Sequence, residues 1–277
     1  MRVEELAAPH LPAFVAAIDA VFVTARGRNG SVAERWPALF RPGGARCFAV
    51  LAEGAPIAGL VARPVRCQAD DRQFIAHQVG FVFTLLPWRG RGLAARVLHA
   101  AAEQVPGPLV LWATRPGLYA KLGWEAWDPH GAKGEWRGEG GTGNEAPVLM
   151  PSMLPDLEAI RARARPRRVA RSEQDWLARP FGAARMLVAR VPQAYALFAQ
   201  QDGRAILYEL VGDPAHYDAL WPHVVQNCRS ALLNLDAESD AARWLRQRGV
   251  TPHPNPLSMW LRWPPADRWS LDWLDRI

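Results

Sequence analysis

The chain has 277 residues, of which 49% are hydrophobic and 22% charged, a composition that excludes a disordered protein and predicts a globular one. Its length is comfortable for two domains of ordinary size. The formal net charge of +6 raises the question of nucleic acid, but the basic residues are spread along the chain, and only Lys121 and Lys133 are lysines. Nucleic acid is therefore not the partner that we expect.

Targeting signals and metal ligands do not stand out in the sequence. Glu4 and Glu5 fall where a signal peptide needs its apolar centre, and no uninterrupted apolar run approaches the roughly 18 residues of a spanning helix. The three cysteines, Cys47, Cys67 and Cys228, are scattered and match neither a disulfide framework nor a metal site. We expect a cytoplasmic protein that has no membrane segment and no bound metal.

The first half of the chain alternates between helical and strand-like patterns. In order, it predicts a helix, a pair of strands around a Gly-Pro turn, a long strand, a helix, a buried strand, and a short helix that leads into another strand. The corresponding residues are 11–23, 47–65, 73–86, 92–104, 108–114 and 118–127. The order predicts a mixed α/β domain with a central sheet.

The stretch 131–144 is rich in glycine, and the residues after it, 146–153, have the pattern of a strand. We interpret the glycine-rich stretch as a mobile hairpin loop inside the first domain. This places the domain boundary near Pro155, with one domain over 1–154 and a second over 155–277.

The second half repeats the order of the first more faintly. Two strands around an acidic-Gly turn are followed by a helix, a strand, a helix and a strand, at 195–213, 214–229, 231–236, 240–249 and 256–263. Between the two halves lies the run "RARARPRRVAR", 161–171, which we interpret as a solvated linker or helix face. An acidic partner remains the alternative for this run, because clustered arginines attract phosphate.

The junction between the long strand and its helix has the sequence Trp88-Arg89-Gly90-Arg91-Gly92. A helix N-terminus has unpaired N–H groups and a partial positive charge, so it stabilises an anion. Glycines at 90 and 92 let a phosphate approach the backbone, and the two arginines add charged donors. We interpret the junction as a diphosphate site.

One family with such a site is that of the dinucleotide-binding enzymes. Gly90-Arg91-Gly92-Leu93-Ala94-Ala95 fits G-x-G-x-x-A, which would imply a nicotinamide cofactor. That fingerprint normally follows the first strand of a parallel sheet and expects an acidic residue about 20 positions on. Here it follows a hairpin and a long strand, and the later position holds Arg115, which suits only a phosphorylated dinucleotide.

A second family accounts for more residues. Arg89-Gly90-Arg91-Gly92-Leu93-Ala94 resembles the R/Q-x-x-G-x-G/A signature of the GNAT acyltransferases, and Tyr119, Gly123 and Trp124 match its second aromatic-glycine element. The resemblance covers about residues 2–153. One departure is Leu86, which stands where the family has a proline; here Pro87 is displaced by one position.

The resemblance implies a fold and a reaction. Acetyl-coenzyme A is expected in a V between the long strand and the next parallel strand, with its diphosphate on the Gly-Arg turn and its pantetheine arm along Val82, Phe83 and Thr84. A backbone N–H of this strand would stabilise the oxyanion. Tyr119 is expected to protonate the leaving thiolate after direct attack by a primary amine of a small molecule or peptide. A half-buried structural tyrosine is the alternative.

The second half resembles a degenerate copy of the same fold, in a tandem arrangement. Asp213 and Pro214 replace the Gly-Arg turn, and a carboxylate there would repel a diphosphate, so we expect one coenzyme A site per chain. The copy would shape the acceptor site or a homodimer contact. No general base is assigned, because the long strand offers only His77 and Gln78.

Several ambiguities stay open at this point. Surface positions are the expectation for His216 and His223, which are spaced seven apart rather than the four usual for a helical zinc pair. Four tryptophans fill the core or line an acceptor pocket: Trp36, Trp88, Trp124 and Trp136. A coenzyme A-binding scaffold without catalysis, a nicotinamide enzyme and a nucleic-acid-binding protein remain the alternative functions.

Overall fold

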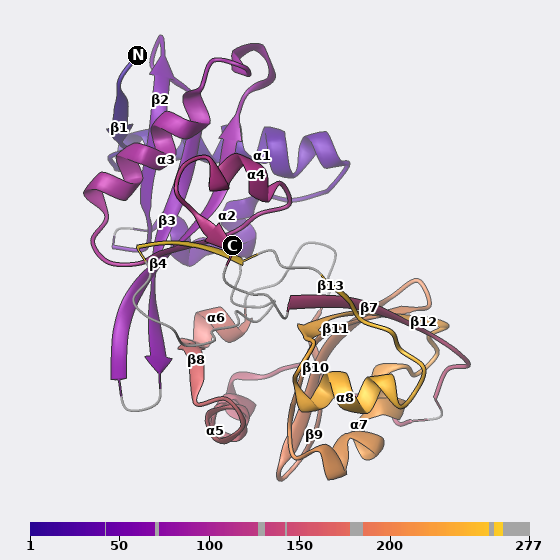
Figure 1. Cartoon of the computed structure of the whole chain (residues 1–277). Helices are drawn as coiled ribbons and strands as arrows, with labels where there is room; N and C mark the ends of the chain where they lie inside the picture. The colour runs from indigo at the N-terminus through magenta and orange to yellow at the C-terminus, as the bar shows by residue number, and fades with distance from the viewer. Residues whose placement is uncertain are drawn as a thin grey trace.

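The computed structural model describes residues 1–41, 43–69, 72–126, 131–141, 143–177, 185–254 and 258–262. These residues form two mixed sheets, one in the upper and one in the lower part of Figure 1, with helices packed against both. The predicted mixed α/β fold is confirmed.

The first sheet is built mainly from the first half of the chain. Its strand order is β1-β2-β3-β4-β5-β14-β6, and β8 adds to the far end of β3. The strands are β1 Val3–Glu5, β2 Arg46–Ala52, β3 Ala55–Ala69, β4 Arg72–Thr84, β5 Leu109–Trp112, β6 Glu125–Ala126, β8 Arg167–Ala170 and β14 Ser258–Leu261. Strand β4 is antiparallel to β3 and parallel to β5.

The second sheet has the order β13-β7-β12-β11-β10-β9. Its strands are β7 Gly131–Arg137, β9 Leu187–Val191, β10 Ala194–Gln201, β11 Arg204–Gly212, β12 Ser230–Asp236 and β13 His253–Pro254. Here β11 is antiparallel to β10 and parallel to β12, so the central part repeats the pattern of the first sheet. This shared pattern of strand directions is the one that the predicted internal repeat would produce.

The two halves exchange one strand each, which corrects two expectations. Strand β7, which we predicted to be a loop of the first domain, pairs along its length with β12 of the second sheet. Strand β14, predicted for the second half, lies between β5 and β6 of the first sheet. The glycines of 131–144 allow the close packing: a Cβ on Gly134 would lie 3.0 Å from Val250 Cγ1. Residues 146–153 are also not a strand; they make one isolated bridge, from Val148 to Leu187.

The helices cover both faces of each sheet (Figure 1). On the first sheet, α1 Leu11–Phe22 and α2 Val32–Arg35 pack on one face and α3 Leu93–Gln104 on the other, with α4 Pro116–Ala120 beside it. On the second sheet, α7 Tyr217–Val224 and α8 Asp240–Arg246 face α5 Leu154–Ala164 and α6 Glu173–Leu177 across the strands.

The helical stretch Ala8–Arg26 is long and apolar enough, by length and composition, to cross a membrane. It consists of α1 and short 3-10 turns on either side. Phe14 and Ile18 of α1 are 0% exposed and pack with strand residues of the first sheet, so this helix covers the sheet in the fold described.

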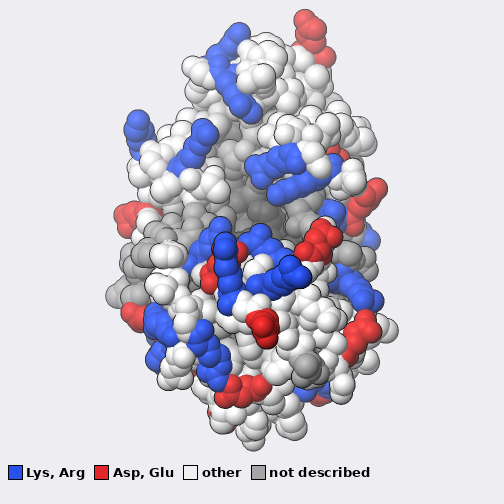
Figure 2. All heavy atoms as spheres, turned by 90° about the vertical axis from the view of Figure 1, so that its right-hand side faces the viewer, with Lys and Arg blue, Asp and Glu red and all other residues white. Residues whose placement is uncertain are grey.

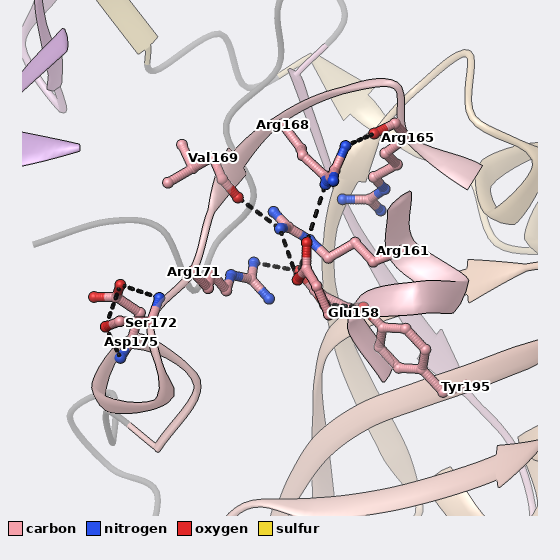
Figure 3. Close-up of polar contacts among 10 residues, drawn as sticks. Glu158, Arg161, Arg165, Arg168, Val169, Arg171, Ser172, Asp175 and Tyr195 are labelled. Atoms are coloured by element: carbon pink, nitrogen blue, oxygen red, sulfur yellow. Dashed lines mark hydrogen bonds and ion pairs between the residues drawn. The ribbon is translucent and has the colours of Figure 1, made fainter. Parts of the chain in front are cut away.

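The arginine run 161–171, which we expected to be a solvated linker or helix face, covers the end of α5 and β8 and is only partly solvated: Arg163 is exposed. Arg161 and Arg171 have fully buried side chains, and both lie against Glu209 of β11 (Figure 3). Arg171 Nη2 donates to Glu209 Oε1 at 2.5 Å, and Tyr195 Oη donates to Glu209 Oε2 at 2.7 Å. Arg171 directly follows β8, and β8 pairs with β3 of the first sheet. The cluster around Glu209 therefore connects β11 of the second sheet to the first sheet.

Candidate functional site

The Gly-Arg turn joins β4 to α3, as predicted. Gly90 and Gly92 have φ of +77° and +71°, a backbone conformation that favours glycine, and Gly92 is the N-cap of α3 without any side-chain cap. The first helical hydrogen bond runs from Arg96 N to Gly92 O at 3.1 Å, so the N–H groups of residues 93–95 have no intrahelical acceptor. The helix therefore presents free donors to the turn.

The space in front of these donors is open. A Cβ atom placed on Gly90 or Gly92 would find nothing within 4 Å. Both arginines of the turn are exposed; Arg89 Nε donates to Thr84 O at 3.2 Å, and the Arg91 guanidinium carbon lies 4.8 Å from the centroid of the Trp88 ring. Free backbone N–H groups, glycines with open space beside them and two exposed guanidinium groups suit a diphosphate.

The helix behind the turn is anchored as the sequence predicts. Leu93, Val97, Leu98 and Ala101 are each no more than 3% exposed and belong to the core between α3 and the sheet. Leu86, which stands where the family has a proline, is 74% exposed, and residues 86–88 form a 3-10 turn. The displaced proline thus sits inside this turn and leaves α3 in place.

Strands β4 and β5 separate just before the turn. Their parallel register is described for three pairs only, from His77 opposite Leu109 to Val79 opposite Leu111. Beyond this point β4 continues to Thr84 and keeps β3 on its other side. The pairing of β4 with β5 therefore ends before Val82, Phe83 and Thr84, the residues at which we expect the V between the two strands.

A β-bulge sits at the start of the open arm. Opposite Leu60 of β3, strand β4 has the two residues Phe81 and Val82, and Phe81 adopts a left-handed φ of +49°. A bulge re-aims backbone groups out of the ladder and is common beside active sites. No sequence pattern indicates the bulge, because phenylalanine is a poor residue for that backbone conformation.

Tyr119 lies in α4, at the end of β5, on the side of the V opposite β4. Its ring packs edge-to-face with Trp124 at a centroid distance of 6.3 Å, and it contacts the same core cluster as Val82, Trp88 and Leu93. Burial raises the pKa of its hydroxyl above the ordinary value of 10. The structure therefore brings Tyr119 to the same core as the Gly-Arg turn, with its hydroxyl protonated at neutral pH.

The remaining titratable groups that we considered lie elsewhere. His77 is buried at the closed end of the V, where burial, more than the charge of Arg46, lowers its pKa. On the second sheet, His216 contacts Gln193 at 3.1 Å, and His223 contacts the carbonyl of Asn144 at 2.8 Å. Among the described residues, no three His, Cys, Asp or Glu side chains could hold a metal ion.

The corresponding turn of the second sheet is closed. Asp213 caps the 3-10 turn Pro214–His216 and accepts a hydrogen bond from Ala215 N at 3.0 Å. Its carboxylate occupies the position of the Gly-Arg turn, as predicted. Helix α5 also lies over this end, since Ile160 and Arg163 line a groove of about 570 Å³ together with Gly212 and Asp213.

Comparison with known proteins identifies the fold. No protein-family model and no curated protein sequence matches the chain. Among solved structures, a GCN5-related N-acetyltransferase from Anabaena variabilis is similar with a TM-score of 0.70 at 14% identity, over 94% of this chain and 72% of the other. A GCN5-related N-acetyltransferase from Kribbella flavida gives 0.66 at 14% identity, over 94% and 71%. Eis1 from Mycobacterium abscessus gives 0.63 at 18% identity, over 94% and 73%.

These likenesses, together with the order of the strands and the Gly-Arg turn between β4 and α3, show that the chain has the fold of the GNAT superfamily. The resemblance seen in the sequence is thus confirmed at the level of fold. The dinucleotide-binding interpretation is wrong as a fold, because the strand before the turn is antiparallel to β3 and not the first strand of a parallel sheet.

Proposed function

We propose that the chain is an acetyl-coenzyme A-dependent N-acetyltransferase that modifies a primary amine. The observation that carries the proposal is that the pairing of β4 with β5 ends shortly before the uncapped N-terminus of α3. Acetyl-coenzyme A has a diphosphate at one end and its thioester at the end of a flexible arm. It therefore needs an anion site for the diphosphate and, next to that site, an unpaired strand edge for the arm. The neighbours named as N-acetyltransferases support the same class.

In this proposal the Gly-Arg turn holds the diphosphate of coenzyme A. The N–H groups of residues 93–95 and the guanidinium groups of Arg89 and Arg91 would donate to the phosphate oxygens. The open arm of β4 from Val82 to Thr84 would pair with the pantetheine amides. Acetyl-coenzyme A, when bound, supplies an acetyl group activated as a thioester.

Two features of the chain would then serve the transfer. A backbone N–H turned out of the ladder at the Phe81–Val82 bulge would stabilise the negative charge that develops on the thioester oxygen. Tyr119 would donate its proton to the leaving sulfur, because its raised pKa keeps the hydroxyl protonated. The acceptor amine attacks directly, so the chain needs no covalent intermediate.

A two-part assay tests the proposal. Acetyl-coenzyme A at 100 times its dissociation constant should stabilise the protein by about 2.7 kcal/mol, seen as a rise in melting temperature. A screen over classes of amine should then show release of free thiol that depends on the amine. Binding without any release would favour a scaffold, and a shift caused by NADP(H) but not by coenzyme A would favour a nicotinamide enzyme.

A further inference from the structure

The segment between α1 and the end of α2 is strongly basic. Residues 24–36, here called the arginine segment, contain Arg26, Arg28 and Arg35 and a single acidic residue, Glu34. Arg26 and Arg28 are exposed, and Arg35 is half-buried. Figure 2 shows that Lys and Arg side chains are spread over the face turned to the viewer, with Asp and Glu side chains among them.

The arginine segment is joined to the bulge of β4 by stacked rings. The Arg26 guanidinium carbon lies 4.9 Å from the centroid of the Phe22 ring, and that ring packs on the edge of Phe81 at 5.4 Å. Trp36, at the other end of the segment, packs on Phe81 at 5.5 Å. The ring of Phe22 thus lies between the Arg26 guanidinium group and Phe81, the residue of the bulge at which we expect the V to begin.

The three arginines lie close to one another. Arg28 Nη1 donates to the carbonyl of Phe22 at 3.5 Å, which places it beside the ring on which Arg26 stacks. Burial, together with the charges of Arg26 and Arg35, lowers the pKa of Arg28. The three guanidinium groups therefore add to one positive field at this segment, and such a field attracts an anion.

The acidic side chains around the segment are used to fix its shape. Asp19 accepts hydrogen bonds from Ser31 Oγ at 2.6 Å and from Val32 N at 2.8 Å. Glu34 accepts from Ser31 N at 3.0 Å and completes a capping box. These contacts hold the start of α2 in place, so the arginines are presented by a defined turn rather than by a loose loop.

We propose that the acceptor amine carries a negatively charged group, a carboxylate or a phosphate ester, and that the arginine segment binds this group while the amine reaches the V. The inference rests on the proposed transferase function and names its substrate class. It predicts that polyamines are poor acceptors, because the same charges repel them.

The test compares acceptors that differ in one charged group. With acetyl-coenzyme A fixed and saturating, we expect thiol release to be at least about tenfold faster, in kcat/KM, for L-phenylalanine than for 2-phenylethylamine, or for O-phosphoethanolamine than for ethanolamine. The two pairs distinguish a carboxylate from a phosphate. Spermidine serves as the polycationic acceptor.

Variants assign the preference to the segment. Arg26→Gln with Arg28→Gln should remove the preference for the anionic member of the pair and leave the affinity for acetyl-coenzyme A unchanged. Arg204→Gln, which removes an exposed charge at the start of β11 in the second sheet, is the matched control and should keep the preference.

The outcomes separate the two claims. Equal release for the charged and neutral members of both pairs, or faster release with spermidine, would overturn the inference and leave the transferase function standing. A preference that survives the double substitution would also overturn it. No release from any amine, while acetyl-coenzyme A still binds, would overturn the transferase function and with it the inference.

Discussion

Tyr119 is the residue on which the proposed chemistry depends most. It lies in a core shared with the Gly-Arg turn, and burial raises its pKa. A proton donor to sulfur must be protonated before transfer, and the raised pKa ensures this up to a pH above 10. The single hydroxyl oxygen can be removed without disturbing the packing of the ring on Trp124.

For Tyr119→Phe we therefore expect kcat to fall by about 10²–10⁴-fold with little change in the affinity for acetyl-coenzyme A. Steady-state kinetics and calorimetry on the same preparation would measure both quantities. In the native protein, loss of the Tyr119 proton should lower kcat only above about pH 10, and this decrease should be absent from the variant. An unchanged kcat in Tyr119→Phe would make the tyrosine a packing residue.

Glu209 is the residue whose pKa links the stability of the protein to pH most strongly. Burial alone would raise its pKa, but the charges of Arg171 and Arg161 and the hydrogen bond from Arg171 lower it to about 2. Because this pKa is lower than the ordinary 4.5 of an unfolded chain, its stabilising contribution is complete above about pH 4.5 and is lost as the pH falls toward 2.

Glu209→Gln removes the buried carboxylate that Arg161 and Arg171 share, so we expect a loss of about 3–5 kcal/mol in the free energy of unfolding at pH 7. The loss should shrink on going from pH 5 to pH 3. Glu135→Gln, which removes an exposed partner 3.6 Å from Arg204, is the control and should cost less than about 1 kcal/mol. Equal costs for the two variants in urea titrations would show that the buried cluster contributes nothing special.

At the scale of elements, β14 is the strand whose position matters most. It comes from the end of the described chain and inserts between β5 and β6, where Trp260 is 1% exposed and packs with Val110 and Val169. The stability of the first sheet thus depends on a strand about 130 residues away in sequence from its neighbour β6.

Trp260→Ala should lower the free energy of unfolding by about 3–5 kcal/mol, because it opens a cavity in this core. It should also weaken acetyl-coenzyme A binding, since β5 forms one arm of the V. Met150→Ala, at a side chain that is 51% exposed, is the control and should change both quantities little. A Trp260→Ala protein with native stability would contradict the exchanged position of β14.

The elements also show where the sequence was informative. The limits of α3, the hairpin of β2 and β3, and the capping role of Asp213 follow from local patterns, and the structure has them as predicted. The exchange of β7 and β14 could not be predicted, because a strand's pattern says which face is buried but not which sheet receives it. The bulge at Phe81 and the burial of Arg171 likewise arise from tertiary packing, which local propensity does not report.

For the whole molecule, the exchange of strands makes the two sheets interdependent. Each sheet contains a strand supplied by the other half, and the Arg171–Glu209 pair adds a further tie between β8 and β11. If the first sheet unfolds, β14 loses its partner strand β5, and if the second sheet unfolds, β7 loses its partner strand β12. The chain should therefore unfold as one cooperative unit.

Urea unfolding followed by far-ultraviolet circular dichroism and by tryptophan fluorescence should give a single transition with coincident midpoints. Acetyl-coenzyme A, whose proposed site lies on the first sheet alone, should shift both signals together. Two separated transitions, of which only one responds to the ligand, would show that the halves fold independently in spite of the exchange.

We propose that the turn between β4 and α3 binds the diphosphate of coenzyme A. Isothermal calorimetry with coenzyme A and with pantetheine, which lacks the nucleotide and its phosphates, measures the contribution of the diphosphate to the affinity. We predict that coenzyme A binds at least about 100-fold more tightly to the native protein, and that Arg89→Gln with Arg91→Gln removes most of this difference. Equal affinities for the two ligands, or a difference that the double variant leaves intact, would contradict the account.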